Sequence, residues 1–246
     1  MKKRFKIIAV LLFVFAASFI LLPFVTSPHG ESYFISTENT DKMIALTFDD
    51  GPGEHTVELL NGLEKLNAKA SFFLLGKNIE KNADTVKEIH SGGHLIGSHT
   101  YSHKTLYNSS FSEFEADLQK ANELIECITG EDVMFFRPPH GHYTGRQLNK
   151  IEQISVLWSN DPADWKHLDS DYVYEYLIKH AGDGKIFLLH DTKKTTVDGV
   201  LKAIAELTEQ GFKFVRADEL LCRNGDGLKF GLAYRGCKNS KPQFYF

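Results

Sequence analysis

Short apolar runs alternate with longer amphipathic segments between residues 43 and 215. Runs of three to six apolar residues predict buried strands, and apolar residues that recur every three or four positions predict helices. Strands are expected at 43–48, 70–75, 95–97, 133–136, 154–158, 186–189 and 213–215. Helices are expected between them, at 56–66, 83–90, 111–128, 146–153, 172–180 and 197–210.

The regular alternation of strands and helices predicts an α/β fold in which helices cover a parallel sheet. The chain of 246 residues is long enough for one large domain or two small ones. A barrel and an open, doubly wound sheet both fit the pattern, because hydrophobic periodicity does not report how a sheet curves.

The predicted helix over 111–128 carries the clearest signals at its ends. Ser110 and Glu113 have the spacing of a capping box, and Gly130 follows as a terminating residue. Cys127 lies among apolar residues near the end of this helix, and we expect it to be a buried thiol. The apolar face consists of Phe111, Phe114, Leu118, Ala121, Ile125 and Ile128.

Residues 1–27 have the pattern of an export segment. Four basic residues precede the uncharged stretch Ile7–Leu22, and Pro23 follows it. The 19 residues from Ile7 to Val25 suit either a cleaved signal peptide or a membrane anchor. Both alternatives predict that the rest of the chain is exported, to the extracellular space or to the cell surface, where an uncleaved segment would anchor it to the membrane.

Beyond this segment the sequence predicts a linker, a single catalytic domain and a tail. The linker is expected at 28–42, which is rich in Ser, Thr, Asn and His, and the domain at 43–221. The tail, 222–246, is Gly-rich at its start. Cys222 and Cys237 flank that Gly-rich part and could form a disulfide that pins it.

Composition and charge exclude several classes of protein. With 42% hydrophobic and 24% charged residues, the chain is neither disordered nor collagen-like. The formal charge is −4, but the first 30 residues contain four basic residues and no acidic one, so the remainder carries 24 positive and 32 negative residues, a charge of −8. An acidic domain disfavours a nucleic acid as partner.

Polar residues follow five of the predicted strands. The carboxyl ends of parallel strands meet at one edge of a sheet, where the active sites of such folds form. We therefore expect five segments that are far apart in the sequence to build one site. They are Asp49-Asp50-Gly51-Pro52, His99 with His103, Arg137-Pro138-Pro139, Asp161 with Asp164-Trp165, and His190-Asp191.

These residue types suit a metal-dependent hydrolase. His99 and His103 are four residues apart, a spacing that places two imidazoles on one face of a helical turn. A carboxylate from Asp49 or Asp50 would complete a zinc site with an open position. The other aspartate could act as general base toward an attacking water, and His190 could protonate the leaving group. Each segment alone has a plainer explanation, such as a turn at 49–52 or a surface pair of histidines; their placement at one edge favours a shared site.

Five motifs in order resemble those of the polysaccharide deacetylases, the NodB-homology family or carbohydrate esterase family four. They span residues 43 to about 220, nearly the whole exported part. The motifs are Thr47-Phe48-Asp49-Asp50-Gly51-Pro52, His99-Thr100-Tyr101-Ser102-His103, Arg137-Pro138-Pro139-His140-Gly141, Asp161-Pro162-Ala163-Asp164-Trp165 and Ile186-Phe187-Leu188-Leu189-His190.

The resemblance implies a fold and a metal centre. The fold would be a distorted (β/α) barrel of about seven strands. Asp50, His99 and His103 would hold a divalent metal, usually zinc, with cobalt or nickel as alternatives. Asp49 would be the general base.

The resemblance also implies roles for residues of the later motifs. Arg137 would orient and support Asp49, with Asp164 as the partner of Arg137. His190 would be the general acid, and Asp164 would tune its charge. The backbone N–H of His140 would help to stabilise the oxyanion. Trp165 and Leu188 would form the walls of the pocket for the acetyl methyl group.

One position departs from the commonest family pattern, which often has an aromatic residue in place of His140. Because the implied role there belongs to the backbone, the change need not abolish catalysis but could alter the groove and the substrate. His142 and Tyr143 extend the polar surface beside it, and a second metal site using His140 and His142 is a minor alternative.

The substrate that the resemblance implies is an N-acetylated polysaccharide. An exported domain without a wall-binding module favours N-acetylglucosamine polymers near the membrane, first peptidoglycan and then other cell-surface or chitin-like glycans. O-deacetylation of acetylxylan is the enzymatic alternative. A catalytically silent glycan-binding relative is the alternative of another class.

Overall fold

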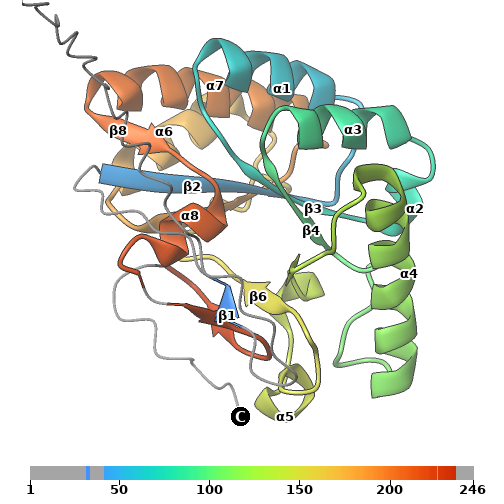
Figure 1. The fold of residues 1–246 in the computed structure, drawn as a ribbon. Helices are drawn as coiled ribbons and strands as arrows, with labels where there is room; N and C mark the ends of the chain where they lie inside the picture. The colour runs from blue at the N-terminus through green and yellow to red at the C-terminus, as the bar shows by residue number, and fades with distance from the viewer. Residues whose placement is uncertain (1–31, 34–41, 226, 237–246) are drawn as a thin grey trace, which may run out of the picture.

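The computed structural model describes residues 32–33, 42–225 and 227–236 (Figure 1). Its main sheet is parallel throughout, with the strand order β7-β2-β3-β4-β5-β6-β10, and β8 pairs with the first residues of β2. The strands are β2 (Lys42–Asp49), β3 (Ser71–Leu74), β4 (Leu95–Ser98), β5 (Phe135–Phe136), β6 (Ile154–Val156), β7 (Lys185–Leu189), β8 (Phe212–Phe214) and β10 (Ala233–Tyr234).

The sheet curls into a half-barrel, as expected for a distorted (β/α) barrel. The segment that follows β6 lies beside β7, because Asn160 forms an isolated parallel bridge with Phe187. The Asn160 carbonyl also accepts a hydrogen bond from the Leu188 N–H at 3.0 Å. This contact draws the two sides of the barrel together next to the carboxyl ends of β2 and β7.

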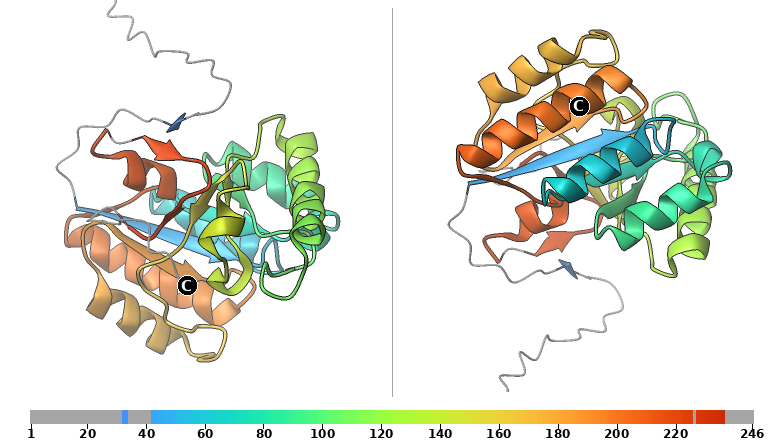
Figure 2. Two further views of the ribbon diagram at one scale, coloured as in Figure 1. Left: turned by 90° about the horizontal axis from the view of Figure 1, so that it is seen from below. Right: turned by 90° about the horizontal axis from the view of Figure 1, so that it is seen from above.

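Helices cover the outside of the half-barrel. In Figure 2, α7, α1 and α3 lie side by side across the strands, with α6 beside α7 and α4 beside α3. The helices are α1 (Thr56–Lys65), α2 (Gly76–Ile79), α3 (Ala83–Ser91), α4 (Phe111–Thr129), α5 (Gly145–Leu148), α6 (Ser170–His180), α7 (Lys194–Glu209) and α8 (Ala217–Cys222), and a 3-10 turn spans Pro139–Gly141.

Both faces of β2 contribute to the core. Every residue of β2 from Met43 to Asp49 is buried, which is the pattern of a strand covered on both faces in a parallel sheet. On one face Phe48 stacks on Phe72 of β3, with ring centroids 5.3 Å apart. The strand that carries the first polar motif is therefore held rigidly from both sides.

All seven predicted strands are present, and most predicted helices agree within a few residues. The predicted helix over 146–153 is wrong in length: α5 ends at Leu148, and Ile151, beyond the end of the helix, is buried in the same apolar cluster as Leu148. The sequence analysis did not predict α2, α8, β10 or the short strand β9 (Leu228–Lys229). Cys127 is exposed rather than buried, because it lies on the opposite side of α4 from Ile125.

The two ends of the chain are only partly described. The predicted export segment at 1–27 lies outside the described residues, as does Cys237, so the disulfide with Cys222 stays a prediction. Within the predicted linker, β1 (Ser32–Tyr33) pairs antiparallel with β9 (Leu228–Lys229). Because β10 joins the main sheet, the sheet extends past the predicted boundary at residue 221. None of the helices in the described ranges is long and apolar enough to cross a bilayer.

Candidate active site

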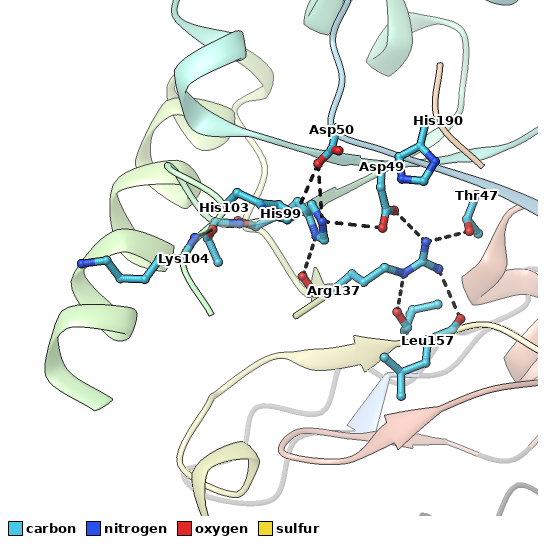
Figure 3. A network of polar contacts seen from close by, with 12 residues as sticks. Thr47, Asp49, Asp50, His99, His103, Lys104, Arg137, Leu157 and His190 are labelled. Atoms are coloured by element: carbon cyan, nitrogen blue, oxygen red, sulfur yellow. Dashed lines mark hydrogen bonds and ion pairs between the residues drawn. The ribbon is translucent and has the colours of Figure 1, made fainter. Parts of the chain in front are cut away.

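The polar motifs meet at the carboxyl ends of the strands (Figure 3). Asp49 ends β2, and Asp50 follows it. A cavity of about 420 Å³ opens there. Its lining includes eight of the ten residues predicted for the site, and the other two, Arg137 and Asp164, lie buried beneath it. The lining residues are Asp49, Asp50, His99, His103, His140, Trp158, Asp161, Trp165, Leu188 and His190.

Asp50, His99 and His103 form a cluster with the donors of a metal site. One ligand atom from each lies within 4.8 Å of the others. The Nε2 atoms of His99 and His103 are 3.7 and 3.6 Å from Asp50 Oδ1, which is too far for hydrogen bonds. Asp50 Oδ1 is buried without a hydrogen-bond partner among the described residues. A cation between the three atoms would satisfy it.

The environment of His99 prepares it as a neutral ligand. Its Nδ1 lies 2.8 Å from the Arg137 carbonyl oxygen, and since a carbonyl only accepts, Nδ1 carries the proton and Nε2 presents its lone pair to the cluster. Burial lowers the pKa of His99 to about 3, with the Asp50 carboxylate opposing the change. Burial also lowers the pKa of His103. Metal binding requires this neutral form.

The expected helical turn across His99 and His103 is wrong. Residues 99–105 form a loop in which Thr100 and His103 both have φ 66°. Asp50, with φ 70°, and His140, with φ 58°, are also left-handed. With Ala163, at φ 53°, five of the six described non-glycine residues with positive φ lie in the predicted motifs, and such strain concentrates at functional sites. The loop brings the two imidazoles together, with ring centroids 5.0 Å apart.

Asp49 is held by a fully buried arginine. Arg137 Nη1 donates to Asp49 Oδ1 at 2.7 Å and to Thr47 Oγ1 at 2.8 Å. Arg137 Nε donates to the Val156 carbonyl at 2.7 Å, and the guanidinium lies 4.2 Å above the Phe73 ring. Burial raises the pKa of Asp49, and the charge of Arg137 opposes the rise. The other oxygen of Asp49 faces His99 Nε2 at 3.6 Å.

His190 is held from behind by Asp164. Asp164 Oδ1 lies 2.8 Å from His190 Nδ1, and Asp164 Oδ2 accepts from the His190 N–H at 2.8 Å and from Thr196 Oγ1 at 2.7 Å. Burial disfavours the imidazolium, but the hydrogen bond and charge of Asp164 outweigh burial and raise the pKa of His190 to about 9. The expectation that Asp164 also partners Arg137 is wrong, because within the described ranges the hydrogen bonds of Asp164 go to His190 and Thr196.

Asp191 supports the loop that carries the two aspartates. Its carboxylate is fully buried, accepts a short hydrogen bond from Thr56 Oγ1, and has a pKa raised by burial to about 7. A Cβ at Gly51 would lie 2.6 Å from Asp191 Oδ2, so only glycine fits above this carboxylate. The Asp50-Gly51 turn is thereby fixed against β7.

Comparison with known proteins agrees with this geometry. A family model described as polysaccharide deacetylase matches residues 36–156. A peptidoglycan-N-acetylglucosamine deacetylase of Bacillus cereus is 37% identical over 192 residues, covering 75% of this chain and 70% of that protein. The chain belongs to the polysaccharide deacetylase family.

Other similar proteins are named for different substrates. A peptidoglycan-N-acetylmuramic acid deacetylase, PdaA of Bacillus subtilis, is 31% identical over 74% of this chain and 72% of its own length. A solved structure, a T48 deacetylase with substrate, has a TM-score of 0.76 and 36% identity, covering 79% of this chain and 97% of its own. An acetyl xylan esterase from Clostridium thermocellum with a cobalt ion has a TM-score of 0.74 and 27% identity, with coverage of 80% and 100%.

The polysaccharide deacetylase site also contains residues to which the sequence analysis gave no role. Thr47 precedes Asp49 by two positions, so both point to the same side of β2, and strand alternation alone could have indicated it. Trp158 lines the cavity and lies 5.5 Å from the Arg137 guanidinium. Thr196, at the start of α7, had no signal in the sequence, since its contact with Asp164 spans 32 positions.

The rim of the deacetylase cavity differs from its floor. Trp165 is 57% exposed and Leu188 is buried, so the lining includes both an exposed indole and a buried aliphatic side chain. His140 also lines the cavity and is exposed, with its ring 4.7 Å from that of His103. The arrangement offers a metal-binding cluster, a buried carboxylate held by an arginine and a protonatable histidine around one space.

Proposed function

We propose that this chain is a metal-dependent N-deacetylase of N-acetylglucosamine-containing cell-surface polysaccharide, with peptidoglycan as its first substrate. The observation that carries the proposal is the convergence of three groups on one cavity. They are the metal-ligand cluster at Asp50, the Asp49–Arg137 pair and the His190–Asp164 pair.

The donor set fits a divalent cation, and zinc is our first choice, with cobalt or nickel as alternatives. Bound by Asp50, His99 and His103, the cation would polarise the acetamide carbonyl and make a water acidic enough to attack it. An amide needs such help, because it is a weak electrophile with a poor leaving group.

Asp49 is the general base in this proposal. Burial raises its pKa, which makes it a better proton acceptor, and Arg137 keeps it ionised and fixed in place. It takes one proton from the attacking water. Arg137 is a positioning residue, since it reaches the reaction only through Asp49.

His190 is the general acid, and it gives its proton to the departing amine nitrogen as the carbon–nitrogen bond breaks. Asp164 fixes Nδ1 of His190, so that Nε2 is the nitrogen available to the cavity. The raised pKa keeps His190 protonated at neutral pH. The products are acetate and a sugar with a free amine.

The rim residues hold the acetamide. The backbone N–H of His140 is our candidate for the second oxyanion donor. Trp165 and Leu188 would enclose the methyl group, a role that their presence in the lining of the cavity supports. A second metal at His140 and His142 stays a minor alternative.

Peptidoglycan is preferred on two grounds. The Bacillus cereus and Bacillus subtilis relatives are named for peptidoglycan substrates. The export segment at 1–27 would place the domain outside the cytoplasm, extracellular or at the cell surface, close to such a substrate.

Acetate release tests the proposal. Purified protein is incubated with peptidoglycan, chitooligosaccharide and acetylxylan, before chelation, after chelation and after zinc is restored. We expect release from peptidoglycan that chelation abolishes and zinc restores. His99→Ala should stay inactive with zinc, whereas His90→Ala, at a half-exposed site on α3, should behave like the wild type. Undiminished release after complete chelation would contradict the metal-dependent mechanism, and release from acetylxylan alone would favour O-deacetylation.

A further inference from the structure

The three residues of the metal-ligand cluster come from two separate loops. Asp50 lies in the loop that follows β2, whereas His99 and His103 lie in the loop that follows β4. The donor atoms meet only while these two loops keep a fixed distance from each other. The contacts that connect the loops are therefore part of the metal centre.

The segment 75–78, which runs from the end of β3 into α2, holds the Asp50 loop. The Leu75 N–H donates to the Gly51 carbonyl at 3.0 Å. Asn78 Nδ2 donates to the Asp50 carbonyl at 2.7 Å. Both hydrogen bonds go to backbone carbonyls, so they fix the path of the loop without involving the Asp50 carboxylate.

The same segment holds the histidine loop. The Gly76 N–H donates to the Thr100 carbonyl at 3.0 Å. The next N–H, that of Lys77, donates to the Tyr101 carbonyl at 3.1 Å. A Cβ at Gly76 would lie 2.5 Å from Tyr101 Cδ2 and 2.9 Å from Tyr101 Cα, so only glycine permits this close approach. The segment 75–78 is thus hydrogen-bonded to both loops of the cluster.

Two of these hydrogen bonds go to residues with a left-handed backbone. Asp50 has φ 70° and Thr100 has φ 66°. The Asp50 carbonyl accepts from Asn78, and the Thr100 carbonyl accepts from Gly76. Residues other than glycine rarely adopt this conformation, and it persists only where the surrounding structure holds it. Asn78 therefore stabilises the turn that carries the Asp50 carboxylate.

The segment 75–78 is itself fixed by its surroundings. Leu75 is 3% exposed, and Ile79, directly after the segment, is fully buried in the main apolar cluster. Asn82 Nδ2 donates to the Asn78 carbonyl at 2.9 Å, which holds the end of α2. Asn78 therefore reaches the Asp50 loop from a rigid position.

We propose that Asn78 is a positioning residue of the metal centre, which holds Asp50 at the distance from the two histidines that a divalent cation needs. This inference rests on the proposed function and adds a residue to its metal site. Asn78 is absent from the described lining of the catalytic cavity, so it acts only through Asp50. Removing its amide should therefore weaken metal binding.

Zinc affinity tests the inference, measured on metal-free protein by competition with a chromophoric chelator. Asn78→Leu keeps nearly the size of the side chain and removes the donor. We expect it to lower zinc affinity about 10- to 100-fold, the usual effect of losing a group that orients a metal ligand. Asn78→Ala removes the same donor without bulk and should have the same effect. Asn61→Leu is the matched control, because Asn61 is exposed on α1, and it should bind zinc like the wild type.

Visible absorption of the cobalt-loaded proteins separates positioning from a general loss of structure. The cobalt bands depend on the arrangement of the ligands around the ion. They should change in position or intensity in both Asn78 variants and stay as in the wild type in Asn61→Leu. Circular dichroism confirms that each variant is folded before its metal binding is compared.

Either of two results in the folded Asn78 variants would overturn the inference and leave the proposed function in place. One is zinc affinity equal to that of the wild type, and the other is an unchanged cobalt spectrum. A wild type that takes up neither zinc nor cobalt would instead overturn the proposed function, and the inference with it.

Discussion

At the scale of single residues, the site depends on two buried ion pairs with different tasks. Arg137 fixes the Asp49 carboxylate and Asp164 fixes the His190 imidazole; in the mechanism we propose, the carboxylate must stay ionised and the imidazole protonated. Both pairs are shielded from water. If one member is removed, the other remains as a buried charge without a partner, and its desolvation penalty is no longer offset.

The alkaline limit of activity should report His190. Its pKa is raised to about 9 by Asp164 against the effect of burial, and the acid form is active, so activity should fall as pH rises through that region. In Asp164→Asn the limit should move to lower pH by about one unit or more, because burial then acts unopposed. The measurement is the pH dependence of acetate release. An unchanged alkaline limit in this variant would contradict the role of Asp164.

Arg137→Met should destabilise the fold by about 3–5 kcal/mol, because Asp49 would remain buried without its cation. Urea unfolding measures this loss, with the exposed Arg146→Met as control. The double variant with Asp49→Asn should recover part of the stability, since it removes the stranded charge. A loss below about 1 kcal/mol, the range of surface ion pairs, would show that the pair is not a buried one in solution.

The sequence was sufficient to predict which residues meet in the cavity. It was not sufficient to predict their backbone conformation or the buried residues that hold them in place. The strand-end rule brings Asp49, His99 and His190 together, as the cavity shows. The spacing of His99 and His103 suggested a helix, whereas left-handed residues in a loop achieve the same proximity. Thr196 reaches Asp164 across the fold, and no local pattern reports such a contact.

At the scale of elements, long segments with strong hydrophobic periodicity were predicted correctly, whereas short helices and strands were mispredicted or missed. The capping box of α4 is present, with Ser110 Oγ accepting from the Glu113 N–H and Gly130 left-handed at the other end. The helix predicted over 146–153 is too long because its apolar spacing is ambiguous. Leu148 and Ile151 are three residues apart and both are buried, a spacing that fits a continued helix as well as the turn that the chain forms there. The two residues of β10 are too few for a pattern.

The packing of α6 on α7 depends on one glycine. A Cβ at Gly199 would lie 2.5 Å from the Ser170 carbonyl and 2.8 Å from Val173 Cβ, so the helices must separate to admit it. We expect Gly199→Ala to lower the free energy of unfolding by about 1–3 kcal/mol. Gly182→Ala is the control, because its nearest neighbours are at ordinary contact distance. Equal stability of the two variants in urea would contradict this close approach.

At the scale of the whole molecule, the chain combines an acidic folded domain with a basic, apolar N-terminal segment. The domain is a half-barrel, and one cavity at its strand ends is lined by most of the predicted site residues. The segment at 1–27 is our proposed export signal or anchor, and it would decide where that chemistry takes place.

Deleting residues 1–27 should keep the protein in the cytoplasm, whereas the full chain should be found outside it. Cell fractionation measures the location, and the mass of the exported protein shows whether the segment is cleaved or retained as an anchor. The purified deletion variant should release acetate like the full chain. Export of the deletion variant at the level of the full chain would contradict the assignment.

The central claim is that Asp50, His99 and His103 bind a metal while the adjacent Asp49 acts as a base. Zinc content and acetate release measured together on Asp49→Asn and His99→Ala test it most directly. We predict that Asp49→Asn binds zinc like the wild type but releases acetate about 10²- to 10⁴-fold more slowly, the usual contribution of a general base, and that His99→Ala loses both. Wild-type zinc content with near-normal acetate release in Asp49→Asn would contradict the account.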